Sequence, residues 1–540
     1  MFSSAVGWMR GAVVVVVAGL ALVATGLGAS AGSGAGAQGR GEGRAAAFAI
    51  EEATITAVHG EMRAGRLTCE ALVQHYLRRI EAYDKQGPAI NALILVNPRV
   101  VDEARALDAR RRAGEPMAPL HCVPMIVKDN FETRDLPSTN GSLALAGFVS
   151  AKDAFQVARV KAAGALVLAK SNLAEWAFTP YETVSSILPG YTKNPYALDR
   201  VTAGSSGGTA AAVAANFGLV GLGSDTGNSI RGPSSHQALV GMRSTMGLTS
   251  RGGVMPLNLW ADIAGPMGRT VEDVARVFQV VAGEDPGDPV TAAARGREVP
   301  DYVAGLRADG LKGARIGVLR QAYERPDMDA EVAAVFRQAL ADLERAGAVV
   351  VDPAAIEGLA AIRRPQGMEP CGGFKYDINR YLASHGDRVP VKSLTEIVAS
   401  GRFHPSVRRQ LEQTEQGPAH GPDTQACEAD QAYRAQMREA VLATMTRLRL
   451  DAFVYPTWSN PPRLIGDLNT PHGDNSQLFS PTTGFPALQV PMGYTRDGQL
   501  PAGLTFFGRA WDEATLFRMG YAYEQATKHR RPPASAPSLP

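Results

Sequence analysis

Apolar residues recur along this chain with two different spacings. Thr68 is a suitable N-cap for the helix that the next apolar residues predict by their spacing: Leu72, Val73, Tyr76, Leu77 and Ile80. A second helix is predicted over residues 100–112. Short apolar runs at 123–127, 165–169 and 219–222 then alternate with joints rich in Gly, Ser and Pro. Runs of this length are typical of strands buried on both faces, so the pattern predicts an α/β fold.

The second half of the chain continues the alternation of predicted strands and helices. Residues 315–351 predict a strand, a helix and a second strand. A further strand is predicted at residues 451–455, and a last helix over 512–526. Residues 365–425 are polar and predict a mostly helical insertion that caps the core. We see no repeat and no linker, so we expect one large domain over residues 48–530, followed by a loose Pro-rich tail at 531–540.

The first 47 residues have a different composition. Arg10 is followed by an apolar run over residues 11–29 and then by a stretch of Gly, Ala and Ser. This order predicts a secretory signal peptide over residues 1–37, or ending already at residue 31, and a low-complexity linker at 38–47. We therefore expect export to the periplasm or the outside of the cell. An uncleaved membrane anchor is the alternative, because the run is close to the length that spans a bilayer.

Composition and charge narrow the class of protein. Among the 540 residues, 45% are hydrophobic and 20% are charged, which argues against disorder and against a polytopic membrane protein. Lys and Arg number 55 against 53 Asp and Glu, without a basic cluster, so we expect no nucleic-acid partner. The nine histidines are scattered and no metal-binding motif is present, so neither a metal nor a cofactor is expected.

The sequence leaves the state of the four cysteines open. They lie far apart and form no recognisable disulfide framework: Cys69, Cys122, Cys371 and Cys427. One or two bridges would suit an exported protein, but their pairing is not readable, and buried free thiols are the alternative.

Two segments rich in Gly and Ser hold the candidate chemistry. Residues 203–209 (AGSSGGT) run into a helix-forming stretch, and residues 223–233 (GSDTGNSIRGP) follow an apolar run. Both place hydroxyl groups beside backbone N–H groups that small residues leave accessible, as a nucleophile and an oxyanion hole require. The alternative interpretation is two turns in a chain that contains 57 glycines.

A nucleophilic serine also needs a base. Gly204-x-Ser206-x-Gly208 matches the nucleophile elbow of α/β-hydrolases, which would pair Ser206 with a histidine. Lys128 is the other candidate base, because burial at the end of an apolar strand would favour its neutral amine. An ion pair with Asp129, or simple exposure, is the alternative for Lys128. The later histidines lie in ordinary polar contexts: His236, His385, His404, His420 and His472.

Taken together, these segments resemble the amidase signature family of serine amide hydrolases. The family's Gly-Gly-Ser-Ser-Gly-Gly, Gly-Ser-Asp-Thr-Gly-Gly-Ser-Ile-Arg and Val-Lys-Asp-Asn blocks correspond to residues 203–208, 223–231 and 127–130. Further matches bring the coverage to residues 49–527. The resemblance implies a single large α/β domain with a central mixed sheet covered by helices on both faces.

The resemblance also implies a set of site residues. Ser229 is expected to be the nucleophile, Ser205 the bridging serine after a cis Gly204–Ser205 peptide bond, and Lys128 the base. The oxyanion hole is expected from four backbone N–H groups: Thr226, Gly227, Asn228 and Ser229. Asn228 departs from the family, which has glycine there; if that position needs a positive φ, Asn is among the better-tolerated residues.

The resemblance therefore implies an exported amidase that cleaves a carboxamide C–N bond through an acyl-enzyme on Ser229. The substrate would be a small-molecule or peptide amide, and residues 365–425 would shape its pocket. We expect no stable membrane contact once the signal is removed, and the sequence leaves a homodimer open. The alternatives are an esterase that uses Ser206 with a histidine, and an amidotransferase-like subunit, against which export and the lack of a basic surface argue.

Overall fold

The computed structural model describes residues 48–362, 371–419, 421 and 424–539. The chain divides between Ala47 and Phe48, and all of the described residues belong to the unit that begins at Phe48. The predicted signal peptide and linker therefore lie outside the described residues.

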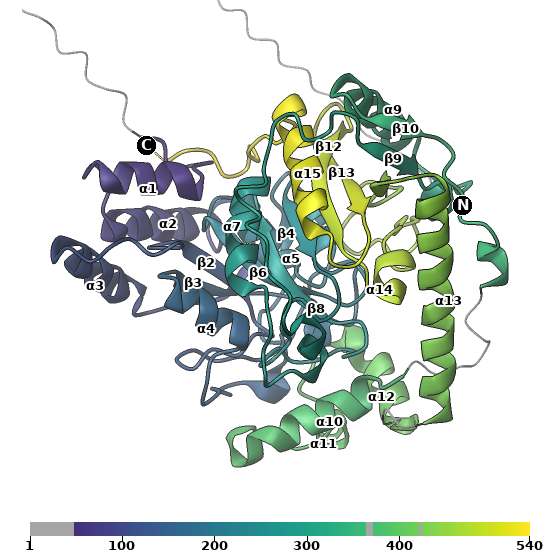
Figure 1. Cartoon of the computed structure of the whole chain (residues 1–540). Coiled ribbons are helices and arrows are strands. Elements are labelled where there is room, and N and C mark those ends of the chain that lie inside the picture. The colour runs from purple at the N-terminus through teal and green to yellow at the C-terminus, as the bar shows by residue number, and fades with distance from the viewer. Residues whose placement is uncertain (1–47, 363–370, 420, 422–423, 540) are drawn as a thin grey trace, which may run out of the picture. The chain divides into compact units, whose positions relative to one another are not determined.

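A mixed sheet of eleven strands runs through this unit (Figure 1). Its order is β1-β3-β2-β6-β8-β7-β12-β13-β11-β9-β10, and β4 and β5 form a separate two-stranded sheet. The strands are β1 Leu93–Val96, β2 Pro124–Lys128, β3 Leu166–Ser171, β4 Lys193–Asn194, β5 Ala197–Val201, β6 Val220–Asp225, β7 Val240–Arg243, β8 Ile263–Gly268, β9 Arg315–Val318, β10 Val349–Val351, β11 Ala452–Pro456, β12 Ala487–Thr495 and β13 Leu500–Phe507. The mixed sheet that the resemblance implied is confirmed.

Fifteen α-helices belong to the described residues. They are α1 Ile55–Arg63, α2 Cys69–Tyr83, α3 Val100–Arg112, α4 Phe155–Ala162, α5 Gly207–Ala214, α6 Arg231–His236, α7 Val271–Val281, α8 Arg320–Tyr323, α9 Ala330–Arg345, α10 Phe374–His385, α11 Leu394–Ser400, α12 Arg408–Gln416, α13 Gln425–Arg447, α14 Phe479–Thr483 and α15 Glu513–Thr527. The helix predicted after Thr68 is α2, and the Thr68 side chain caps it by accepting a hydrogen bond from Ala71 N. None of the described helices is both long and apolar enough to cross a bilayer.

Helices cover both faces of the sheet, as the alternation of side chains along β11 and β13 requires. Val454 and Phe506 belong to the apolar cluster that includes residues of α7, α9 and α15. Their neighbours Phe453 and Phe507 face the other way, into a cluster that includes residues of α13 and α14. Two layers of helices therefore sandwich the sheet.

The order of the central strands brings the candidate site together. β2 runs parallel to both of its neighbours, β3 and β6, and Val127 pairs with Leu222. The carboxyl ends of parallel strands meet at one edge of a sheet. Lys128 at the end of β2 and Asp225 at the end of β6 are thus brought to the same edge.

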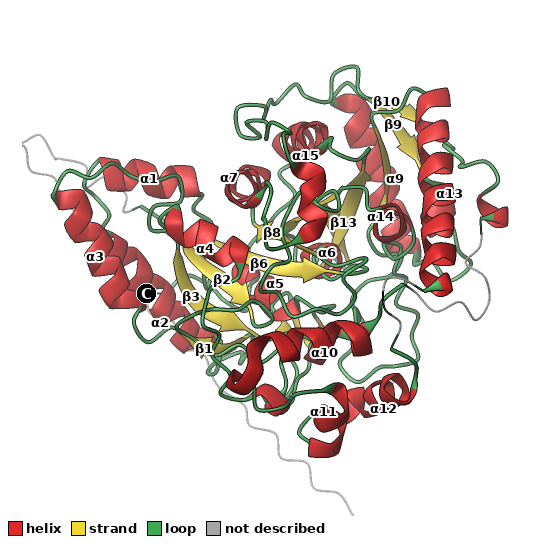
Figure 2. Cartoon of the chain, turned by 60° about the horizontal axis from the view of Figure 1, so that its bottom comes forward, coloured by secondary structure: helices red, strands yellow, loops and turns green. Residues whose placement is uncertain are grey.

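Residues 371–419 form three helices, α10, α11 and α12, that lie together beside the sheet (Figure 2). Their apolar side chains, such as Ile378 and Leu394, join one cluster with Trp176 and Met255 of the core. The helical prediction for this segment is confirmed over these residues, while residues 363–370 lie outside the described part.

All four cysteines form disulfides, which settles what the sequence left open. Cys69 at the start of α2 is bonded to Cys122, and Cys371 is bonded to Cys427 near the start of α13. The second bridge joins the two ends of the segment that contains α10, α11 and α12. The alternative of buried free thiols is excluded.

The C-terminal tail differs from the prediction of a loose segment. The guanidinium of Arg79, which is buried, donates to the carbonyl oxygens of Ala536 at 2.7 Å and Pro537 at 2.8 Å. Ser535 Oγ donates to Pro195 O at 2.6 Å. A Pro-rich composition gave no sign of these contacts, because they depend on a buried arginine more than 450 residues away in sequence.

Candidate active site

Lys128 lies fully buried at the end of β2 and contacts two serines. Its Nζ donates to Ser205 Oγ at 2.7 Å and to Ser224 Oγ at 2.8 Å. Burial lowers the pKa of Lys128 from 10.5 to about 7, although Asp225 and Asp262 oppose this shift. A large fraction of Lys128 is therefore neutral near pH 7 and can accept a proton.

Asp129 does not pair with Lys128. Consecutive residues at a strand end point to opposite sides, and Asp129 forms a buried ion pair with Lys170 of β3, with Oδ1 at 3.1 Å from Nζ. The alternative interpretation of Lys128 as an exposed lysine or a partner of Asp129 is wrong. The lysine that pairs with Asp129 is instead Lys170, and this buried ion pair is structural.

Ser205 follows a cis peptide bond, as the resemblance implied. The backbone of residues 179–182 presses against this turn. Gly204 N donates to Pro180 O at 2.7 Å, and a Cβ on Gly204 would lie only 2.5 Å from Glu182 O and 2.6 Å from Thr179 O. Only glycine fits there, so the close packing fixes the position of Ser205 over Lys128.

Ser229 lies on the loop that follows β6, next to the turn that carries Ser205. Its carbonyl oxygen accepts a hydrogen bond from Ser206 N at 3.2 Å, and the residue is 4% exposed. The Ser229 Oγ has no hydrogen-bond partner among the described residues, including Ser205. The structure thus joins Lys128 to Ser205 directly and brings Ser229 beside them through the backbone.

The loop from Thr226 to Ser229 presents unpaired donors. Within the described part of the chain, the backbone N–H groups of all four residues donate to no protein acceptor. Thr226 and Gly227 are partly exposed, so this loop borders solvent. Four unpaired N–H groups beside a serine hydroxyl are suited to stabilise a tetrahedral oxyanion.

The buried carboxylate of Asp225 accepts hydrogen bonds from the residues that follow this loop. Asp225 Oδ2 accepts hydrogen bonds from Ile230 N at 3.1 Å and from Arg231 N at 3.3 Å, and Asp225 is ion-paired with Arg231 and Arg243. Burial alone would raise the pKa of Asp225, but the two guanidinium groups outweigh it and lower the pKa to about 2. Through these contacts Asp225, Arg231 and Arg243 hold the loop in place, and sequence reasoning missed Arg243.

Sequence reasoning also missed Ser224 and Asn130 as members of the site. Ser224 Oγ accepts from Lys128 Nζ and, at 3.0 Å, from Asn130 Nδ2. Asn130 lies in the motif of residues 127–130 and Ser224 in that of residues 223–231. The parallel pairing of β2 with β6 is what would have assigned both to the site. That pairing brings Asn130, just after β2, against Ser224 near the end of β6.

The hydroxyl of Ser206 is not placed for catalysis with a histidine. Ser206 Oγ is buried and donates to Ser224 O at 3.1 Å. The described histidines have other partners: His236 stacks on Trp458, His385 pairs with Glu132, His404 contacts Ser406 and His472 stacks on Tyr181. His420 lies outside the described residues.

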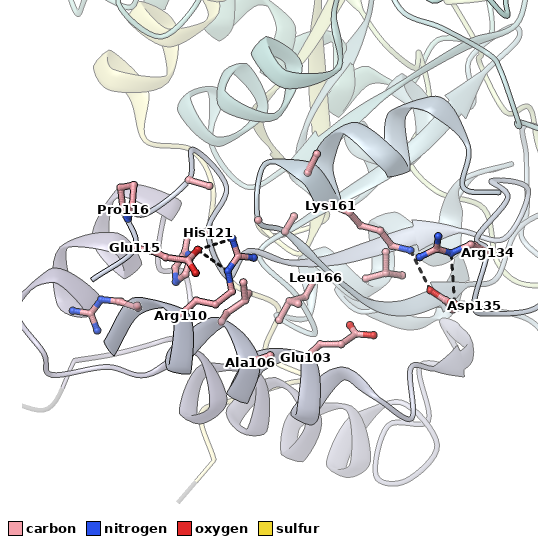
Figure 3. Close-up of a pocket in the computed structure, with 17 residues that line it drawn as sticks. Glu103, Ala106, Arg110, Glu115, Pro116, His121, Arg134, Asp135, Lys161 and Leu166 are labelled. Atoms are coloured by element: carbon pink, nitrogen blue, oxygen red, sulfur yellow. Dashed lines mark hydrogen bonds and ion pairs between the residues drawn. The ribbon is translucent and has the colours of Figure 1, made fainter. Parts of the chain in front are cut away.

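A cavity of about 340 Å³ lies elsewhere, between α3, β3 and α4 (Figure 3). It contains none of Lys128, Ser205 and Ser229. Its charged side chains are already paired, Arg110 with Glu115 and Lys161 with Asp153. No group of three or more His, Cys, Asp or Glu suited to a metal is found among the described residues.

The site and fold define the class of protein, and the comparisons with known proteins agree. The Amidase family model matches residues 71–517. The chain therefore belongs to the amidase family, and it is a hydrolase that acts on amide C–N bonds.

Three relatives illustrate the family. The solved structure of native peptide amidase from Stenotrophomonas maltophilia is 37% identical, with a TM-score of 0.79, over 89% of this chain and 98% of that one. The A subunit of glutamyl-tRNA(Gln) amidotransferase from Moorella thermoacetica is 37% identical over 86% of this chain and 95% of its own length. A probable amidase from Arabidopsis thaliana is 32% identical over 91% of this chain and 93% of its own length.

Proposed function

We propose that the protein is an exported amidase that hydrolyses a small-molecule or peptide carboxamide, with Ser229 as nucleophile, Ser205 as bridging serine and Lys128 as base. The observation that carries the proposal is the buried contact of 2.7 Å between Lys128 Nζ and Ser205 Oγ. It lies beside the loop whose four backbone N–H groups have no acceptor among the described residues.

In this mechanism the neutral amine of Lys128 accepts the proton of Ser205 while Ser205 accepts the proton of Ser229. Ser229 Oγ then attacks the carbonyl carbon, and the N–H groups of residues 226–229 stabilise the oxyanion, with each donor contributing about 2.7–4 kcal/mol. The proton returns along the relay to the leaving nitrogen as the C–N bond breaks. Water hydrolyses the acyl-enzyme and regenerates Ser229.

Two observations support the more specific parts of the proposal. Two disulfides, Cys69–Cys122 and Cys371–Cys427, suit an oxidising compartment and therefore export. The similarity to a protein named peptide amidase supports a peptide amide as substrate.

An amidotransferase component is the second candidate, and similarity to the A subunits of glutamyl-tRNA(Gln) amidotransferases supports it. The two candidates differ in whether the isolated chain is a complete hydrolase. Turnover of simple amides by the purified chain without partner subunits supports the first. Turnover that appears only with partner subunits and an acylated tRNA supports the second.

The decisive experiment measures hydrolysis by the purified mature chain with four groups of substrates: simple carboxamides, peptide C-terminal amides, anilides and fatty acyl amides. We expect Ser229→Ala and Lys128→Ala each to lower kcat at least about 10³-fold, because either change breaks the relay. Ser206→Ala is the matched control, since it removes a neighbouring hydroxyl outside the relay.

We expect the control to lose no more than about tenfold in kcat, because among the described residues the Ser206 hydroxyl contacts the backbone of Ser224 and no member of the relay. Loss of all turnover in Ser206→Ala with activity retained in Ser229→Ala would reverse the assignment in favour of the esterase alternative. Near-normal turnover in Lys128→Ala would remove the relay altogether.

A further inference from the structure

Asn228 has a buried side chain whose role the proposed mechanism does not use. The residue is fully buried, and it does not have positive φ, so its backbone does not require glycine or asparagine. Its carbonyl oxygen accepts from Gly232 N at 2.7 Å, which starts the turn into α6. What the carboxamide does must therefore follow from its own contacts.

The carboxamide of Asn228 reaches a second buried acid on a distant segment. Asn228 Nδ2 donates to Asp474 Oδ1 at 2.9 Å. Asp474 lies between β11 and α14, in a loop whose two arms are joined by a bridge between Trp458 and Asp474 and by a hydrogen bond of 2.6 Å from Ser459 N to Gly473 O. Trp458 Nε1 donates in turn to Gly232 O at 3.1 Å. This segment is thus attached to the loop of residues 226–229 at Asn228 and to the start of α6 at Gly232.

Asp474 is arranged as an acceptor for several donors at once. Its carboxylate accepts from Asn228 Nδ2, from Ser476 N at 2.9 Å and from Gln477 Nε2 at 2.7 Å. Burial raises its pKa to about 6, while these hydrogen bonds and the charge of Arg231 oppose the rise. At and above neutral pH the carboxylate is mostly ionised, and an ionised carboxylate only accepts, so it orients each donor.

Gln477 links Asp474 to a second residue of the loop of residues 226–229, Gly227. A Cβ on Gly227 would lie 1.9 Å from Gln477 Oε1, so the Gln477 carboxamide lies directly against the backbone of Gly227. Its Nε2 is held by Asp474. One carboxylate therefore fixes two carboxamides, and these contact two adjacent residues of the loop that carries the unpaired N–H groups.

We infer that Asp474 is a positioning residue that holds Asn228 and Gln477 against the loop of residues 226–229 and so fixes the direction of its N–H groups. The inference rests on the proposed use of that loop as an oxyanion hole. Misdirected donors stabilise the transition state less while substrate binding is largely kept, so the effect belongs in kcat rather than KM.

A double-mutant cycle tests the inference with two readouts. The first is the rate at which a fluorophosphonate probe modifies Ser229, followed by intact-protein mass spectrometry, which needs no knowledge of the natural substrate. The second is kcat and KM for an amide that the wild type hydrolyses. The variants are Asn228→Gly, Asp474→Ala, the double variant and the conservative Asp474→Asn.

We expect Asn228→Gly and Asp474→Ala each to lower kcat and the labelling rate about tenfold, with KM within about twofold. The double variant should lose no more than Asp474→Ala alone, about tenfold, because Asn228→Gly breaks a contact that Asp474→Ala has already removed. Asp474→Asn should recover most of the rate, since it keeps an oxygen acceptor for Asn228. Asp467→Asn, in the same loop, is the matched control, because Asp467 accepts from Asn469 N and Thr470 N in its own turn.

Losses that multiply to about 100-fold in the double variant, or that fall on KM, would overturn the inference. So would wild-type rates in Asn228→Gly or in Asp474→Ala. If Asp474→Ala does not fold, judged by its melting temperature, Asp474→Ser replaces it in the cycle with the same expected losses, because its shorter side chain does not reach Asn228 Nδ2. A wild type that neither labels nor hydrolyses amides would instead contradict the proposed function.

Discussion

At the residue scale, two buried lysines of this protein differ in their partners. Lys128 Nζ contacts Ser205 and Ser224 and no carboxylate among the described residues, whereas Lys170 in the neighbouring strand is paired with Asp129. Two buried lysines on adjacent strands thus have different surroundings. The paired lysine is suited to a structural role, and the one that contacts neutral hydroxyl groups can supply a base.

The pKa of Lys128 leads to a prediction about pH. Because burial lowers that pKa to about 7 and the neutral amine is the active form, kcat/KM should rise tenfold per pH unit below about 7 and level off above it. The measurement is a pH profile with two amides whose leaving groups differ in basicity, since this separates ionisation of the enzyme from that of the substrate. A limb centred near pH 10 would contradict the prediction, as would a flat profile.

At the element scale, the helices α10, α11 and α12 are attached to the core by more than their apolar faces. Glu132 pairs with His385 at the end of α10 at 2.9 Å, and Glu175 accepts from His404 N at 2.9 Å. Asp377 of α10 accepts from Leu259 N at 2.9 Å, and Asp262 accepts from Leu257 N in the same core loop. Asp262 also contacts Thr226 Oγ1, so these helices are connected to the active-site loop.

The disulfide at the base of these helices should therefore affect stability. Cys371 and Cys427 are separated by 56 residues, and removing a bridge across a loop of that size typically costs about 2–4 kcal/mol. We expect Cys371→Ser with Cys427→Ser to lower the free energy of unfolding by about that amount in urea denaturation.

A thiol titration of the native sequence provides the control for this prediction. Protein purified from an oxidising compartment should give no free thiol after denaturation, because all four cysteines are bonded. Detection of two or more free thiols would contradict the pairing. An unchanged urea midpoint in the double variant would show that the bridge carries no stability.

At the scale of the whole described unit, the C-terminal segment meets the helix α2 and the end of α5. Arg79 of α2 donates to Ala215 O and Asn216 O after α5 as well as to the tail carbonyls of Ala536 and Pro537. Arg530 and Glu52 form an ion pair at 2.7 Å. Segments from both ends of the described chain thus meet on one buried guanidinium and its surroundings.

Removal of residues 531–540 tests this arrangement. The truncation takes two acceptors from the buried Arg79, so we expect the free energy of unfolding to fall by about 2–3 kcal/mol, measured by chemical denaturation. Removal of residues 538–540 alone is the control, because it keeps Ala536 and Pro537. Equal stability of the two truncated proteins would show that the tail does not anchor Arg79.

The sequence by itself determined most of the elements and named the candidate site residues. Periodicity predicted α2, α3, α9 and α15 within a few residues, because amphipathic spacing is a local property that each segment carries alone. The resemblance to the amidase signature family implied Lys128, Ser205 and Ser229 as a group. The contact of Lys128 with Ser205 and the cis peptide bond before Ser205 agree with that grouping.

Only the tertiary structure decided which distant side chains meet. Three sets of contacts depend on the order of the strands and on the tertiary packing of distant segments, which no local pattern encodes. They are the pairing of the cysteines, the ion pair of Asp129 with Lys170, and the contact of Arg79 with the tail. The same holds for Asn228, which stands where the family has glycine. Its side chain donates to Asp474, which lies 246 residues further along the chain. A motif fixes which groups are available, whereas their partners are set by how the sheet places its strand ends.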